Sequence, residues 1–234
     1  MPIAAAVVLA ALLVLLTGCA GVPGGSGSGP AVEAPTYRTG DRWVYRVQSG
    51  WANPLVFDET WTVTSIAPAG IEVSVVGKGA GVDERRTERW SAPGLVTQGA
   101  LMDSETRRFD TPLERFRFPM QAGDRWSQRI GNFNEFLGRQ GTISRTVQVH
   151  GIEKVTVPAG TYDAIRLLVF TTLDDEEFWR WPTRATYEVW YAPAVRGVVR
   201  ERKRATYLQK GGSLDSGVLP AQNETIELLS FTPG

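Results

Sequence analysis

The sequence predicts an all-β domain, a curved antiparallel sheet of half-barrel or sandwich-like form that is built from two related units. Three observations support this prediction: apolar residues alternate with period two, Gly and Pro turns separate the alternating segments, and a set of short motifs occurs twice in the same order. The 234-residue chain is 42% hydrophobic, with 10% aromatic residues, which is typical of a globular chain with a sizeable core.

Alternation of β-branched or aromatic residues with polar ones is the main signal of strands. It is clearest at residues 60–64, 71–75, 143–149 and 185–191. No segment after position 36 holds a convincing 3.6-residue period. We therefore expect helix only as short turns.

The N-terminal segment resembles the signal of a bacterial lipoprotein. Ile3 to Leu16 is an unbroken apolar run, too short for a bilayer span of roughly 20 residues and of the length of a signal-peptide core. It ends in LLTGCA, which is similar to the lipobox in which a small residue precedes a lipidated cysteine. The resemblance implies a signal peptide at 1–18 and a lipid on Cys19, although Met1-Pro2-Ile3 lacks the usual basic residue.

Lipidation of Cys19 implies an extracytoplasmic protein that is bound to a membrane through acyl chains. Ala20 after the cysteine, in place of Asp, is similar to lipoproteins that are sent to the outer membrane. Cys19 is the only cysteine, so no internal disulfide is available. Residues 19–36 are rich in Gly, Ser, Pro and Ala, which predicts a flexible tether before a single domain at 37–234.

Three matched motifs indicate an internal duplication, with units of about 37–118 and 119–234. One chance match would carry little weight, but three in the same order favour a duplication. The motifs are G-D-R-W at 40–43 and 123–126, P-A-G at 68–70 and 158–160, and W-x-A-P at 90–93 and 190–193.

Turn chemistry explains these motifs. Gly and Asp suit the turn before a strand, Trp then supplies a large buried anchor, and Pro ends a strand because it cannot donate to the ladder. The expected structural anchors are Gly40, Asp41, Trp43, Trp90, Gly123, Asp124, Trp126 and Trp190. We therefore interpret the two Asp residues as turn formers rather than as catalytic acids.

The second unit, with VPAGTYDAIRLLV and YEVWYAPAVRGVVRER, resembles a signature of uncharacterised bacterial envelope proteins. In that signature V-P-A-G-x-[YF]-x-A precedes a strand and W-Y-[AS]-P-x-x-G follows in the next hairpin. The resemblance implies no agreed activity. The curved sheets of such proteins are similar to those of lipoprotein carriers of the LolA and LolB type, which is an analogy of fold alone.

The second unit also holds an insertion, centred on residues 174–182 (DDEEFWRWP), at an expected hairpin tip. Phe178, Trp179, Arg180 and Trp181 are the candidate contact for a ligand or partner, because exposed aromatics at a loop tip are costly unless they cover something. Alternatively, they fold back over the open end of the sheet. The four acids could bind Ca²⁺, but charge runs at hairpin tips are usually solvated.

The remaining residues offer little chemistry. Basic and acidic side chains both number 25, so no net charge attracts nucleic acid. His150, the only histidine, lies on the polar face of its strand, where we expect it to be exposed. With Cys19 modified, we find no nucleophile–base pair, no nitrogen–sulfur metal site and no cofactor motif. Charges on both faces of 200–204 predict an edge strand, with contact to phosphate head groups as the alternative.

The leading hypothesis is therefore a non-catalytic, membrane-anchored module of the cell envelope that binds a hydrophobic or extended ligand, or a protein partner. The concave sheet face together with the 174–182 loop is the expected contact. The alternative is a structural component of an envelope complex that docks through the same loop. A hydrolase is the third hypothesis.

Overall fold

The computed structural model describes residues 29–79, 81–102, 105–211 and 217–234. Cys19 and the predicted signal peptide lie outside these ranges. Within them the chain forms twelve strands and one short 3-10 turn, η1. The same ranges contain no helix that is long and apolar enough to cross a membrane. The all-β prediction is confirmed.

The strands follow one another along the chain with short connections. They are β1 (Arg42–Ser49), β2 (Leu55–Ala67), β3 (Gly70–Gly79), β4 (Val82–Ala92), β5 (Leu95–Ala100), β6 (Thr106–Glu114), β7 (Arg125–Asn134), β8 (Arg139–Val157), β9 (Gly160–Asp174), β10 (Thr183–Ala192), β11 (Gly197–Tyr207) and β12 (Leu219–Thr232), with η1 at Pro193–Val195.

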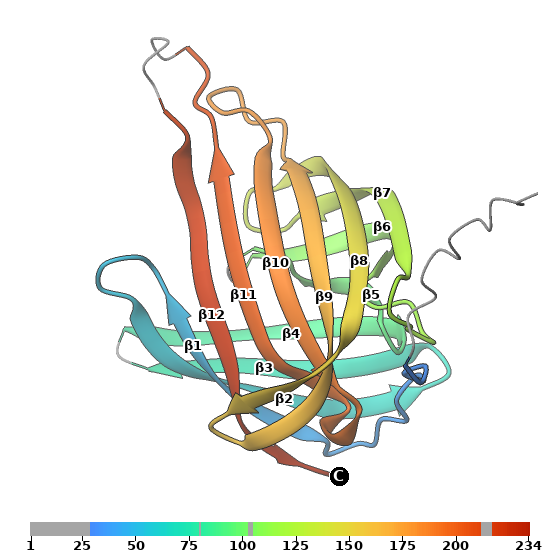
Figure 1. Cartoon of the computed structure of the whole chain (residues 1–234). Helices are drawn as coiled ribbons and strands as arrows, with labels where there is room; N and C mark the ends of the chain where they lie inside the picture. The colour runs from blue at the N-terminus through green and yellow to red at the C-terminus, as the bar shows by residue number, and fades with distance from the viewer. Residues whose placement is uncertain (1–28, 80, 103–104, 212–216) are drawn as a thin grey trace, which may run out of the picture.

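The sheet is a closed barrel, so the expected half-barrel or sandwich was wrong. Each strand pairs antiparallel with its neighbours in sequence, and β12 returns to pair with β1, with Arg42 opposite Thr232 and Ser49 opposite Glu224. In Figure 1, β8–β12 run side by side as a tall wall, and β1–β4 run crosswise to them. Closure leaves no sheet edge open.

The expected edge strand at 200–204 was also wrong. These residues belong to β11, which pairs with β10 on one side and β12 on the other. The alternation of the strand sends Glu201 and Lys203 toward the interior of the barrel, whereas Arg202 and Arg204 are exposed. The charges on the two faces therefore have different surroundings.

The repeated motifs occupy equivalent places in the barrel. G-D-R-W precedes β1 and β7, P-A-G leads into β3 and β9, and W-x-A-P ends β4 and β10. The turn glycines also have matching backbone conformations, with φ of 93° at Gly40 and 94° at Gly123, and 135° at both Gly70 and Gly160. The three motifs therefore lie at matching positions in β1–β6 and in β7–β12.

Each G-D-R-W motif forms a turn closed by its own carboxylate. The Arg38 N–H donates to Asp41 at 2.8 Å, and the Gln121 N–H donates to Asp124 at 2.7 Å. Asp41 is fully buried, because the Arg196 guanidinium and the Gly234 N–H also donate to it, each at 2.9 Å. Asp124 is exposed. Both act as the turn formers that the sequence predicted.

The described chain contacts the barrel before Tyr37, where the sequence placed the start of the domain. Val32, within the predicted tether, is buried and forms an antiparallel bridge with Met120. The two backbone hydrogen bonds of this bridge measure 2.8 and 2.9 Å.

Candidate functional site

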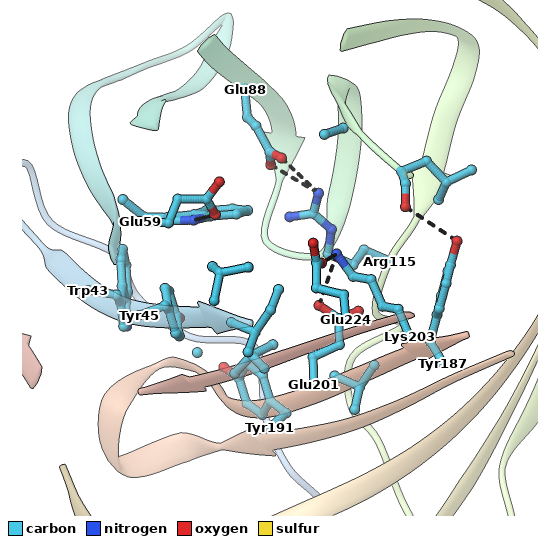
Figure 2. A pocket seen from close by; sticks show the side chains of 18 of the residues that line it. Trp43, Tyr45, Glu59, Glu88, Arg115, Tyr187, Tyr191, Glu201, Lys203 and Glu224 are labelled. Atoms are coloured by element: carbon cyan, nitrogen blue, oxygen red, sulfur yellow. Dashed lines mark hydrogen bonds and ion pairs between the residues drawn. The ribbon is translucent and has the colours of Figure 1, made fainter. Parts of the chain in front are cut away.

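A cavity of about 250 Å³ remains inside the barrel, between the crosswise strands β1, β2 and β4 and the wall formed by β8–β12. Aromatic rings form much of its lining, and they contact one another at centroid distances such as 5.9 Å for Tyr37–Trp43 and 6.2 Å for Tyr45–Trp61. The lining includes Tyr37, Trp43, Tyr45, Trp61, Trp90 and Tyr191. Several of these side chains are visible in Figure 2.

The tryptophan anchors of the two units do not have equivalent roles here. Trp43 and Trp90 line the cavity, and the Trp43 indole donates to the Val195 carbonyl at 2.7 Å. Trp126 and Trp190 are buried but are not part of the lining. The cavity therefore draws its aromatic anchors from the first unit.

Charged side chains also line the cavity, five acidic and five basic among the described residues. Most of them form ion pairs across the interior. Glu59 pairs with Arg86 at 2.7 Å, Glu88 pairs with Arg115 at 3.0 Å, and Lys203 lies 3.0 Å from Glu224 and 3.6 Å from Glu201. Figure 2 shows the Glu88 carboxylate directed toward Arg115, and Glu201 and Glu224 beside Lys203.

The surroundings shift the pKa of several lining side chains, among them Glu59 and Lys203. Burial alone would raise the pKa of Glu59, but the Arg86 guanidinium, as a charge and as a donor, outweighs it and holds that pKa below its ordinary value of 4.5. Burial alone would lower the pKa of Lys203, but Glu201 and Glu224 outweigh it and raise that pKa. Burial raises the pKa of Tyr45 and Tyr187, which stay neutral donors at physiological pH.

Arg145 differs from the other charged residues of the lining. It lies on β8 between Ile143 and Val147, on the same inward face, and is only 7% exposed. Burial, followed by the nearby positive charge of Arg115, lowers the pKa of Arg145 to about 10, so the guanidinium is still charged at neutral pH.

The guanidinium of Arg145 forms no ion pair with any residue that the structure describes. Its Nη2 donates to the Arg115 carbonyl at 3.4 Å, and its Nε is buried without a partner. Sequence analysis missed Arg145, although its position on an otherwise apolar strand face was the signal that could have found it.

The 174–182 insertion lies at the end of the tall wall, beside residues 208–210, which follow β11 (Figure 1). Two of its four acidic side chains form ion pairs. Asp175 forms a bidentate ion pair with Arg107, at 2.6 and 3.0 Å, in which both side chains are fully buried. Glu177 pairs with Arg139 at 3.1 Å. Backbone bonds from Trp181 N to Leu208 O (2.8 Å) and from Lys210 N to Trp179 O (2.7 Å) fasten the loop to its neighbour.

Of the four candidate residues of the insertion, two pack against neighbouring side chains and two are more exposed. Trp179 packs edge-on against Tyr207 with a centroid distance of 5.5 Å, and the Arg180 guanidinium lies 5.3 Å from the Trp179 ring. Phe178 is 81% exposed and Trp181 is 56% exposed. None of these residues lines the cavity, so the loop and the barrel interior are two separate sites.

His150 is exposed, as predicted, and lies at an irregularity of β8 rather than at the cavity. Within the part of the chain that the structure describes, no three His, Cys, Asp or Glu side chains gather to hold a metal ion.

Comparison with known proteins relates the chain to others by fold alone. No family model and no curated protein matches it. A candidate exported protein with a YmcC-like fold from Bacteroides fragilis is 15% identical, with 87% of this chain and 100% of that chain covered and a TM-score of 0.50. A candidate lipoprotein from Parabacteroides distasonis (13%, 87% and 100% covered, 0.48) and the hypothetical lipoprotein YmcC from Escherichia coli (13%, 86% and 89% covered, 0.39) are less similar.

Proposed function

We propose that this protein is a lipid-anchored module of the cell envelope that binds a small ligand inside its barrel and does not convert it chemically. The observation that carries the proposal is the aromatic-lined cavity of about 250 Å³. Its volume lies near the lower end of ligand pockets, which span about 300–1,000 Å³. It suits one small molecule or one chain of a larger one.

The free energy of folding that an unfilled cavity costs is a second argument for a bound ligand. Protein interiors are normally close-packed, with few voids larger than a water molecule. At about 24 cal/mol per Å³, an empty cavity of this volume would cost about 6 kcal/mol, an upper figure because charged lining groups admit water. A ligand that contacts the rings recovers this loss.

Binding is favoured over catalysis by the state of the charged groups. The lining carboxylates Glu59, Glu88 and Glu224 are each engaged by a basic partner, which leaves them poor general bases. The single histidine lies elsewhere. A hydrolase therefore remains the least supported of the three hypotheses.

The predicted lipid on Cys19 is the basis for placing the protein at a membrane, and we propose the periplasmic face of the outer membrane. Cys19→Ser should move the protein from the membrane fraction to the soluble fraction. Unchanged membrane association in the variant would contradict lipid anchoring.

Ligand binding can be tested with full-length Cys19→Ser protein prepared without detergent. Native mass spectrometry should reveal a co-purified small molecule, and titration with 1-octanol should change the fluorescence of Trp43, Trp61 and Trp90 in a saturable way. Absence of both signals would sink the proposal.

A matched pair of variants locates the site. Val47→Phe fills the cavity and should weaken octanol binding, whereas Val56→Phe, on the adjacent strand at an exposed position, should not. Val189→Phe, which fills the cavity from β10, serves if the first variant does not fold. Equal effects of the inward and outward substitutions would place octanol outside the barrel.

The exposed aromatics of the insertion favour the second hypothesis, docking in an envelope assembly. A photo-crosslinking residue at position 178 should then link to a defined envelope protein in cells, and one at Trp51, 55% exposed on the β1–β2 connection, should not. Identical crosslinks at the two positions would indicate chance contact.

A further inference from the structure

We propose that the ligand of the cavity is a small amphipathic monoanion, whose carboxylate binds Arg145 while its apolar part contacts the aromatic rings. This inference rests on the proposed binding function and adds the chemical class of the ligand.

The first support is that Arg145 alone among the described basic residues of the lining has no carboxylate partner. Arg86, Arg115 and Lys203 are paired within the cavity, and Arg196 donates to Asp41 at 2.9 Å. Arg145 is therefore the one basic side chain of the described lining without a carboxylate in contact, and its charge is balanced only at longer range, because Glu201 and Glu224 share one ammonium.

The second support is where this charge lies. A buried charge without a partner is strongly unfavourable, and an apolar or amide side chain at the same position would avoid that cost. Ile143 and Val147 flank Arg145 on the same strand face, so the fold itself has no evident need for a guanidinium there. An anion bound in the cavity would place a negative charge in direct contact with the guanidinium.

The third support is the availability of hydrogen-bond donors. The Nε of Arg145 is buried without a hydrogen-bond partner, and its Nη2 makes only a long hydrogen bond of 3.4 Å to the Arg115 carbonyl. Nη1 has no hydrogen bond to a described residue and is not fully buried, and Arg145 is part of the cavity lining. The Nη1–Nη2 end of a guanidinium matches the two oxygens of a carboxylate.

The neighbouring charges limit the ligand to a single negative charge. Glu201 and Glu224 share the one ammonium of Lys203 and would repel a dianion in the same interior. Glu84, the lining acid for which the structure gives no ion pair, is exposed, so solvent screens its charge.

The test compares octanoate, its neutral counterpart 1-octanol and inorganic phosphate on full-length Cys19→Ser protein in detergent-free buffer, by calorimetry and tryptophan fluorescence. We expect octanoate to bind at least about tenfold more tightly than octanol, as one charge-assisted contact allows. Phosphate alone should show no saturable binding. Saturable phosphate binding without a preference for octanoate would indicate a simple anion site and overturn the proposal.

Variants assign the effect to the guanidinium. Arg145→Gln should abolish the preference for octanoate over octanol, while Arg145→Lys should retain part of that preference. Arg129→Gln, at an exposed position on β7, should change neither affinity. Asp103→Asn is a second check, because residue 103 lies outside the described ranges. Tighter octanoate binding in that variant would show that Arg145 already has a partner in the chain.

Thermal unfolding separates a ligand-binding role from a structural one. Without ligand, Arg145→Gln should melt at or above the wild-type midpoint, and a given octanoate concentration should raise the midpoint of wild type more than that of the variant. A clearly lower midpoint in the unliganded variant would make Arg145 a structural residue and count against the proposal. Equal binding of octanoate and octanol to wild type would overturn this inference but leave the cavity function intact, whereas binding of neither would overturn both.

Discussion

The buried ion pair between Arg107 and Asp175 should anchor the insertion loop to the barrel, and Asp175→Ala should remove that anchor. Arg107 lies on β6 and Asp175 directly follows β9, so the pair joins elements that are far apart in sequence. Both side chains are fully buried, and two hydrogen bonds of 2.6 and 3.0 Å connect them.

The expected loss of stability follows from this burial. Removing one partner of a buried ion pair typically costs about 3–5 kcal/mol, because the other charge is left without compensation. Arg107 keeps two other acceptors, the Glu105 carboxylate at 2.7 Å and the Asn132 amide oxygen at 2.9 Å. We therefore expect the lower end of that range, about 3 kcal/mol.

Urea unfolding followed by tryptophan fluorescence measures the free energy of unfolding directly. The matched control is Asp163→Ala, which removes an ion pair with Lys154 at 2.9 Å whose side chains are 67% and 76% exposed, and should cost less than about 1 kcal/mol. Trypsin should also cleave after Arg180 faster in Asp175→Ala than in the control. A loss in Asp175→Ala no larger than that of the control would refute the reasoning and show that Glu105 and Asn132 suffice for Arg107.

Two further predictions concern pH and the repeated turns. Because the pKa of Glu59 is held below 4.5, its ion pair stabilises the fold above that pH and loses its effect as pH falls through the folded-state pKa. Below about pH 4.5, the free energy of unfolding should therefore drop less steeply in Glu59→Gln than in wild type. Parallel curves of the free energy of unfolding against pH would contradict this. Gly70→Ala and Gly160→Ala both place a side chain at φ of 135°, which costs about 1–3 kcal/mol. Only at Gly70 would the new Cβ lie 2.5 Å from the Trp90 carbonyl oxygen, so Gly70→Ala should show the lower urea midpoint. Equal midpoints would contradict the role of that contact.

The strands and their turns could be predicted from the sequence because their signals are local. Alternation at 143–149 and 185–191 identified parts of β8 and β10, and the repeated G-D-R-W motif identified the turns before β1 and β7. The exposure of His150 followed from its position on the polar face. Each of these inferences needs only neighbouring residues.

The closure of the barrel could not be predicted in this way. It depends on pairing between β1 and β12, whose partners Arg42 and Thr232 lie near opposite ends of the chain. Without that pairing β11 was taken for an edge, and the inward direction of Glu201 and Lys203 was missed.

The candidate site shows the same division. Sequence directed attention to the concave face of the sheet and to the insertion, where Phe178 and Trp181 are exposed, but it could not identify the residues that line the cavity. An arginine at position 145 on an apolar face was visible in the sequence, whereas its lack of a partner was not. The sequence alone determined which segments are strands and where they turn, because backbone propensity and side-chain alternation act over a few residues. Only the tertiary structure decided that the sheet closes around a cavity and which charges inside it are paired, because these depend on contacts between strands remote in the chain.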